Sequence, residues 1–170
     1  MMMSKTIAPG KVQHIHSTAE LGRYLRDSRR EQAVTISDAS ALVSLGERFI
    51  SEIERGKETA FLGKTLQYLN QLGLSLHIYP RNALSIRSPY GALADIKTIG
   101  QLARIHRKKQ KATLDTVTQV SGLGLRFLSE FERGKNSQIG KALDALKTYG
   151  LEVSISPKNY RLNRADLSDE

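Results

Sequence analysis

The sequence predicts a mainly α-helical protein built from two tandem copies of one module, each ending in a short β-strand. The first observation is an internal repeat, because residues 51–57 read SEIERGK and residues 129–135 read SEFERGK, 78 positions later. The second is that apolar residues recur at helical spacing in both copies. The third is an alternating apolar and polar stretch at the end of each copy.

The repeat sets the expected domain organisation. Further pairs at the spacing of 78 include Gly22 with Gly100 and Arg48 with Arg126, and a one-residue deletion then pairs Gly63 with Gly140. We expect an N-terminal arm at 1–17, a first domain at 18–80, a linker at 81–94, a second domain at 95–157 and a tail at 158–170. Residues 84–87 are a candidate for a short extra strand, and the polar ends, 1–11 and 159–170, are expected to fray.

The first copy begins with an amphipathic helix at 19–31, in which Leu21 and Leu25 share one face. Its basic C-terminal end complements the helix dipole. Thr35 is expected to cap the second helix, with Asp38 as the acid of a variant capping box. This short helix runs to residue 43.

The first copy then continues through a break at 44–46 into a third helix at 47–55, which Gly56 ends. A leucine-rich helix follows at 62–72, and residues 74–79 alternate as a half-buried strand does. The second copy repeats this plan, with helices at 98–109, 113–121, 125–133 and 139–149 and a strand at 151–156.

Two short helices joined by a tight turn form a helix-turn-helix. The second copy has Gly122 in this turn, where the first has Ser44. A Ser in a left-handed conformation costs up to about 1 kcal/mol.

The two strands each need a partner, because a solitary strand leaves its edges open. Antiparallel pairing of the two within one chain would relate the modules by a pseudo-twofold axis, and pairing between chains is the alternative.

Composition narrows the function further. The 170 residues carry a net charge of +9 and a pI near 9.9, which favours a polyanionic partner such as nucleic acid. The chain has no cysteine, and no stretch approaches the roughly 18 apolar residues of a membrane span, so we expect a cytoplasmic protein without a membrane partner. The four histidines do not form a metal-site pattern, and we expect no metal, no cofactor and no enzymatic activity.

Residues 35–57 and 113–135 resemble the Xre/Cro-type helix-turn-helix regulators, within them the HipB-like antitoxin and repressor branch. Both ends of these segments, RFISEIERGK and RFLSEFERGK, are similar to the family's recognition helix and the turn after it. The resemblance implies two tandem lambda-repressor-like helix-turn-helix domains. Two departures stand out, because Ile36 and Leu114 occupy a position where the family usually has a phosphate-binding Gln, and the tandem arrangement differs from the usual homodimer.

The resemblance also implies the DNA-contacting residues, since the third helix of this fold lies in the major groove. The expected base-reading residues are Glu47, Arg48 and Glu52 in copy one and Leu125, Arg126 and Glu130 in copy two. Lys57 and Lys135 are expected at phosphates, and Thr35 and Thr113 open the second helices at the DNA. The alternative for each Arg and Glu is a solvated pair at i and i+4. Three phenylalanines at helical spacing favour core packing over base stacking: Phe49, Phe127 and Phe131.

Charge separates the two copies. Residues 18–80 hold 8 basic and 8 acidic side chains, whereas residues 95–157 hold 11 and 6. Neutralised phosphates supply most non-specific affinity, so copy two is expected to bind DNA more strongly. Cations near the end of its first helix are expected to help this binding: Arg104, Arg107, Lys108, Lys109 and Lys111.

These features predict a sequence-specific double-stranded DNA-binding regulator, with a repressor as the leading hypothesis. It would act as an intramolecular pseudo-dimer or as a homodimer. The alternative is a HipB-like antitoxin that binds a HipA-like kinase toxin and autoregulates its operon. A third hypothesis is an interaction module that no longer binds DNA.

Overall fold

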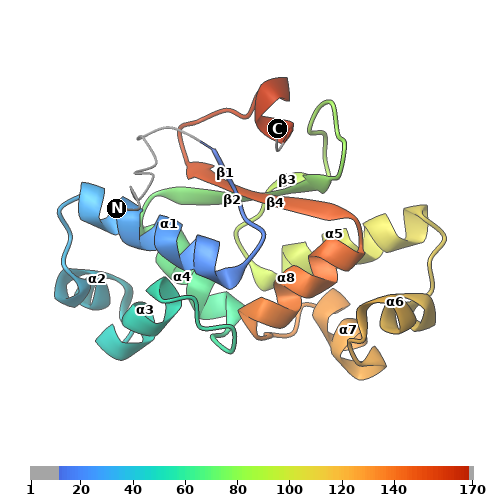
Figure 1. The fold of residues 1–170 in the computed structure, drawn as a ribbon, viewed down its shortest axis with the longest axis horizontal. Coiled ribbons are helices and arrows are strands. Elements are labelled where there is room, and N and C mark those ends of the chain that lie inside the picture. Colours follow the sequence, from blue (N-terminus) through green and yellow to red (C-terminus); the bar gives the residue numbers. More distant parts are fainter. Residues whose placement is uncertain (1–11, 169–170) are drawn as a thin grey trace, which may run out of the picture.

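The computed structural model describes residues 12–168, and within this range the chain contains two sets of four α-helices, each followed by a long strand (Figure 1). The first set is α1 (Thr18–Glu31), α2 (Ile36–Val43), α3 (Glu47–Glu54), α4 (Leu62–Gln71) and β2 (Leu74–Pro80). The second set is α5 (Ile96–Lys109), α6 (Leu114–Ser121), α7 (Leu125–Glu132), α8 (Ile139–Thr148) and β4 (Leu151–Pro157). The elements have the same lengths in both halves: 14, 8, 8, 10 and 7 residues.

The helix starts follow from their caps. Thr35 Oγ1 accepts a hydrogen bond from the Asp38 amide at 3.0 Å, and Thr113 Oγ1 accepts one from Thr116 at 3.1 Å, as a Thr N-cap should. The start expected for α5 at residue 98 was two residues late. The reason is that Asp95 caps this helix and accepts from the Thr98 amide at 2.8 Å, so Thr98 is the third helical residue.

The strands form one antiparallel sheet in the order β1-β4-β2-β3, which confirms the expected pairing of the two long strands within the chain. His77 lies opposite Ser154, its own counterpart 77 positions later, and Leu74 opposite Pro157 is matched by Pro80 opposite Leu151. This register is unchanged when the two halves are exchanged. A pseudo-twofold axis therefore passes through the sheet between His77 and Ser154.

The two outer strands are related by the same pseudo-twofold axis. β1 (Gln13–His14) pairs with β4, and β3 (Gly91–Ala92) pairs with β2, so each half contributes a short strand to the long strand of the other. The extra strand expected at 84–87 was wrong. Those residues form bends and irregular backbone with Leu84 66% exposed, and the hydrogen bonds to β2 are made further along the chain.

A second connection between the halves lies where α4 and α8 begin. Phe61 and Gln138, also 77 positions apart, form an antiparallel bridge. Within residues 12–168, the side chains of the two N-cap residues, Phe61 and Gln138, accept no capping hydrogen bond from their helices. Each half supplies acceptors for the other instead: the Leu62 amide donates to Ser137 O (2.8 Å), Gly63 to Asn136 Oδ1 (3.0 Å), Ile139 to Ala60 O (2.7 Å) and Gly140 to Glu58 O (2.9 Å). The pseudo-axis therefore passes through this bridge as well as through the sheet.

One hydrophobic core extends through both halves, between the sheet and the helices. Its centre contains side chains from α4, α8, β2 and α5, among them Leu66, Leu69, Leu76, Ile99 and Leu146. This shared core and the two cross-connections hold the halves in one fixed arrangement.

The C-terminal segment is ordered as far as residue 168, so the fraying expected at 159–170 was wrong for this part. Asn163 and Asp166 cap the short 3-10 helix η1 (Arg164–Leu167) reciprocally, and Leu167 is buried. His14 Nε2 lies 2.8 Å from the Asp166 carbonyl oxygen, which ties the segment to β1. The arm residues 1–11 and the last two residues lie outside the described part. No helix of the described residues is long and apolar enough to cross a membrane.

Candidate nucleic-acid interface

The helices α3 and α7 lie on one surface of the molecule, on the opposite side from the sheet (Figure 1). Each packs against the helix that precedes it in the chain, α2 or α6. The turn between them contains a left-handed residue, Ser44 with φ 56° or Gly122 with φ 73°. The structure thus contains two helix-turn-helix arrangements that face the same way.

A buried ion pair joins α3 to α1. Arg29 Nε donates to Glu54 Oε1 at 2.6 Å and Nη2 donates to Oε2 at 3.1 Å, while Nη1 donates to the Val34 carbonyl at 2.8 Å. The Tyr68 hydroxyl donates to the same carboxylate at 2.9 Å. The hydrogen bond to Glu54 raises the pKa of Arg29, and burial raises the pKa of Tyr68. The guanidinium therefore connects three elements: α1, α3 and the loop before α2.

The second half repeats this arrangement. Arg107 donates to Glu132 at 2.8 and 2.7 Å and to the Ala112 carbonyl at 2.9 Å, and Tyr149 donates to Glu132. Burial raises the pKa of Tyr149. The expectation that Arg107 contacts phosphate was wrong, because its guanidinium is sequestered in this pair. The equal spacing of 25 residues between Arg and Glu in both copies is the sequence signal that could have revealed it.

Two glycines permit the close approach of the helices that this ion pair joins. A Cβ on Gly22 would lie 2.4 Å from the Ile53 carbonyl oxygen, and one on Gly100 would lie 2.3 Å from the Phe131 oxygen. Any side chain here would push α1 from α3, or α5 from α7. The repeated glycine is thus required by helix packing.

The exposed face of each recognition helix carries a charged trio. Arg48 Nε lies 3.1 Å from Glu52 Oε1, and Lys57 Nζ lies 2.9 Å from Glu52 Oε2. In the second half, Arg126 and Lys135 lie 3.1 and 3.3 Å from Glu130 Oε1. The Lys57 and Arg48 hydrogen bonds lower the pKa of Glu52, and those of Arg126 and Lys135 lower the pKa of Glu130.

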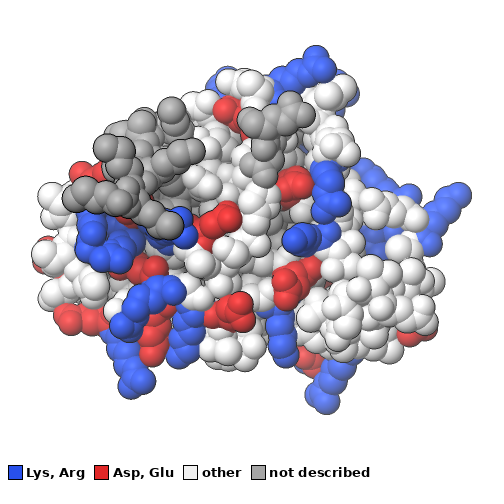
Figure 2. All heavy atoms as spheres, viewed as in Figure 1, with Lys and Arg blue, Asp and Glu red and all other residues white. Residues whose placement is uncertain are grey.

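These trios bring most of the expected site residues together. The Arg48 and Arg126 side chains are 90% and 91% exposed, so each guanidinium is free to exchange its carboxylate for another acceptor. Each trio carries two cations and one anion, and so presents a net positive charge to the solvent. In Figure 2, Lys and Arg side chains project from the lower edge, beneath the region of α3 and α7.

The first residues of the two recognition helices differ. Glu47 opens α3 and is exposed, whereas Leu125 opens α7 and is 47% exposed. The half-buried Ile36 and Leu114 side chains pack against the core, so neither second helix offers the amide that the family usually places there. Thr35 and Thr113 are exposed at the starts of α2 and α6.

Two lysines next to the recognition helices are additional candidates. Lys64 Nζ lies 5.4 Å from the centre of the Phe49 ring, and Lys141 Nζ lies 5.7 Å from that of Phe127. Both lysines are exposed, and both phenylalanine rings are partly buried under them. The repeated Gly-Lys pair at 63–64 and 140–141 was their signal in the sequence.

Four other cations of the second half occupy a different place. Arg104, Lys108, Lys109 and Lys111 are exposed at the C-terminal end of α5 and just beyond it. This end of α5 points to the outer flank of the molecule (Figure 1), where Figure 2 shows a cluster of basic side chains. The cluster therefore lies beside the helix-turn-helix rather than on its recognition helix.

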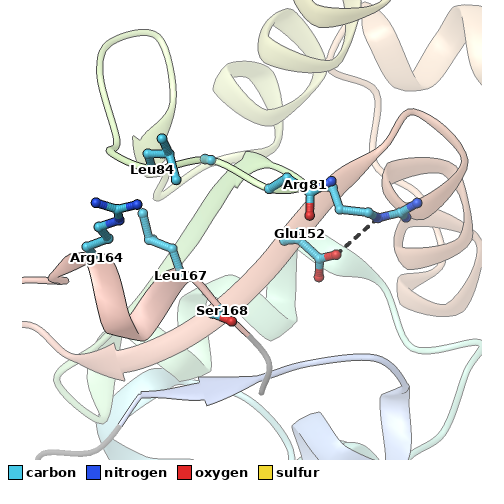
Figure 3. Close-up of a pocket in the computed structure, with 8 residues that line it drawn as sticks. Arg81, Leu84, Glu152, Arg164, Leu167 and Ser168 are labelled. Atoms are coloured by element: carbon cyan, nitrogen blue, oxygen red, sulfur yellow. Dashed lines mark hydrogen bonds and ion pairs between the residues drawn. The ribbon is translucent and has the colours of Figure 1, made fainter.

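A cleft of about 490 Å³ lies on the sheet side of the molecule (Figure 3). Arg81 follows β2 and pairs with Glu152 of β4 at 3.2 Å, and Arg164 projects from η1 on the other side. These side chains lie by the sheet and η1, on the side of the molecule away from α3 and α7 (Figure 1).

The arrangement of two short helices, a left-handed turn and an exposed second helix defines the helix-turn-helix class. The chain is 47% identical over 58 residues to the uncharacterized HTH-type transcriptional regulator y4mF of Sinorhizobium fredii (strain NBRC 101917 / NGR234). The match covers 34% of this chain and 76% of that protein. No protein-family model and no solved structure gives a significant match. The chain belongs to the HTH-type transcriptional regulators, a class whose partner is DNA.

Proposed function

We propose that the chain is a sequence-specific repressor in which one polypeptide supplies both DNA-reading units of an operator complex. The units are tandem Xre-type, HipB-like domains at 18–80 and 95–157. The short strand before each domain, β1 or β3, pairs with the long strand of the other domain. The supporting observation is the pseudo-twofold axis, which relates α3 to α7 and leaves both exposed on one surface. Such symmetry in the protein calls for an inverted pair of half-sites in the DNA.

The recognition helices would enter successive major grooves on one face of the duplex, with half-site centres roughly 34 Å apart. Arg48 and Arg126 are placed to donate two hydrogen bonds to guanine, since their guanidinium groups are exposed and held near α3 and α7 by a carboxylate. Glu52 and Glu130 orient these groups and can accept from cytosine N4.

The phosphate contacts would come from groups around each recognition helix. Lys57 and Lys135 follow α3 and α7, and their ammonium groups donate to Glu52 and Glu130. The Thr35 and Thr113 hydroxyls each accept from a helix amide, at helix N-termini that favour a phosphate, and Thr113 also shares a hydrogen bond with the Thr116 hydroxyl at 2.9 Å. Bound in this way over a promoter, the protein would exclude the polymerase.

The second half should supply the larger share of the affinity. The buried Arg–Glu pairs cancel within each half, so the surface charges remain 0 for residues 18–80 and +5 for residues 95–157. The flank cluster on α5 is positioned for phosphates next to the second half-site, and Glu47 of the first half repels them.

The test is a selection from random duplexes with the whole chain, combined with the mass of the complex. We expect enrichment of an inverted pair of half-sites about one helical turn apart, bound by one chain. Failure to enrich any sequence would overturn the proposal, and two chains per single pair of half-sites would overturn the pseudo-dimer. The antitoxin alternative rests on the family resemblance, and co-purification of a kinase is the result that would favour it.

A further inference from the structure

An exposed aromatic side chain lies on the pseudo-twofold axis. Phe61 is 48% exposed, and it bridges to Gln138, its own counterpart in the other half. The axis leaves the molecule at two points: the sheet, at His77 and Ser154, and this bridge. In Figure 1 the N-terminal ends of α4 and α8 meet low in the molecule, between α3 and α7, so Phe61 lies on the recognition side.

The direction of the ring follows from the geometry of the bridge. Residues directly opposite in an antiparallel pair point to the same face, and the local twofold of such a pair is perpendicular to that face. Both side chains therefore point along the pseudo-axis, either into the core or away from it. Because Phe61 is exposed and the core lies between the bridge and the sheet, its ring points away from the sheet.

The backbone on which Phe61 stands is braced from both halves. Leu62 N donates to Ser137 O at 2.8 Å and Ile139 N donates to Ala60 O at 2.7 Å, on either side of the bridge. Phe61 O accepts from the Thr65 amide at 3.1 Å and from its hydroxyl at 2.8 Å. Because these hydrogen bonds already order the backbone, binding through the exposed ring would cost little further backbone entropy.

This position fits one part of the proposed complex. When two recognition helices occupy successive major grooves on one face of DNA, the twofold axis between them meets the minor groove at the centre of the operator. Each half carries an exposed lysine in the loop that leads to the bridge, Lys57 before Phe61 and Lys135 before Gln138, and such cations suit a polyanionic partner. Phenylalanine is one of the apolar residues that partly unstack a base step from the minor groove.

We propose that Phe61 inserts into the minor groove at the central base step of the operator and bends the duplex there. The inference rests on the proposed function and adds a contact outside the helix-turn-helix units. It makes the centre of the operator, which no recognition helix reaches, a determinant of affinity. Steps that unstack easily, such as TA and CA, should be preferred at this point over a stiff A-tract.

The test compares the wild type with Phe61→Ala and Phe61→Gln on duplexes recovered by the selection, with the central step changed to TA or to an A-tract. Phe61→Gln places in the first half the residue that the second half already carries, so the bridge is retained. Leu84→Ala is the matched control, because Leu84 is also exposed and lies in the connector after β2, away from the recognition helices. Anisotropy at fixed salt measures affinity, and energy transfer between labelled duplex ends measures the bend.

We expect both Phe61 variants to lose about tenfold in affinity for the TA duplex, to bind the two duplexes equally and to bend the DNA less. The salt dependence should stay unchanged, because no phosphate contact is removed. Wild-type affinity and central-step preference in both variants would overturn the inference while leaving the proposed function intact. So would a change of the free protein's mass in solution without a change in DNA binding, since Phe61 would then serve a protein interface. A wild type that enriches no sequence would overturn both proposals.

Discussion

The two halves of the molecule agree in their interior and differ on their surface. Arg29, Glu54 and Tyr68 in the first half make the same hydrogen bonds as Arg107, Glu132 and Tyr149 in the second. The tyrosine comes from a place one helical turn later in the second half, because the counterpart of Tyr68 is Ala145 and Tyr149 follows four residues after it. The hydrogen bond is thus kept although the residue that makes it has moved.

The differences concentrate where a DNA duplex would lie. The first residue of the recognition helix is Glu47 in the first half and Leu125 in the second. On the axis, the first half contributes Phe61 and the second half Gln138. The second half carries the flank cluster on α5 and a net charge of +5, whereas the first half has a net charge of zero. The interior thus fixes where each recognition helix lies, while the exposed residues are free to differ in what they bind.

The largest expected effect tests the shared interior. Replacing Glu54 or Glu132 by Ala leaves a buried guanidinium without its carboxylate, and each change should lower the free energy of unfolding by about 3 to 5 kcal/mol. Urea denaturation followed by circular dichroism measures the loss, with Glu58→Ala as an exposed control in the first half. A loss below about 1 kcal/mol in either half would contradict the equivalence of the two anchors.

The next effect tests the difference in DNA binding. Arg126→Ala should cost about 1 to 3 kcal/mol of specific binding free energy, and Arg48→Ala less, because the surface of the second half is more cationic. Titration of the selected duplex at several salt concentrations measures both losses. Equal losses at every salt concentration would show that the charge difference does not decide which half binds more strongly.

A smaller effect concerns the turn of each helix-turn-helix. Ser44→Gly should stabilise the protein by about 0.5 to 1 kcal/mol, because φ is 56° at this position, and Gly122→Ser should destabilise it by a similar amount. A Cβ at Gly122 would meet no described atom within 4 Å, so only the backbone conformation opposes the serine. Thermal unfolding measures both variants, and changes of the same sign would contradict this account.

The sequence allowed the helices, the long strands and their pairing to be predicted, because these follow from apolar spacing, caps and a repeated pattern. It did not reveal the cross-capping of α4 and α8, in which Ser137 and Ala60 contribute carbonyl groups. A backbone acceptor has no residue type, so a sequence carries no sign of it. The two-residue strand β3 was missed for a similar reason, since two residues are too few to show alternation.

The candidate site was predicted in part. The exposure of Arg48 and Arg126 and their pairing with Glu52 and Glu130 are as the i, i+4 spacing indicates. Arg107 was assigned to the wrong environment, because a basic run at a helix end does not show which of its members points inward. Phe61 was not singled out, because its significance comes from the symmetry axis and not from its neighbours in the chain.

The smallest expected effect concerns the pH dependence of stability, to which the two halves contribute differently at the sheet end of the axis. Burial lowers the pKa of His77, whose Nε2 lies 2.9 Å from Ser156 Oγ, whereas its counterpart Ser154 does not titrate. As the pH falls below the ordinary histidine value near 6.5, the unfolded chain takes up a proton before the folded one does, so the free energy of unfolding decreases. Burial lowers the pKa of His106 too and adds to the same trend. We expect His77→Gln to reduce the slope of stability against pH between about 7 and 5 without abolishing it. Urea denaturation across this range measures the slope, and parallel curves for variant and wild type would place the acid sensitivity elsewhere in the fold.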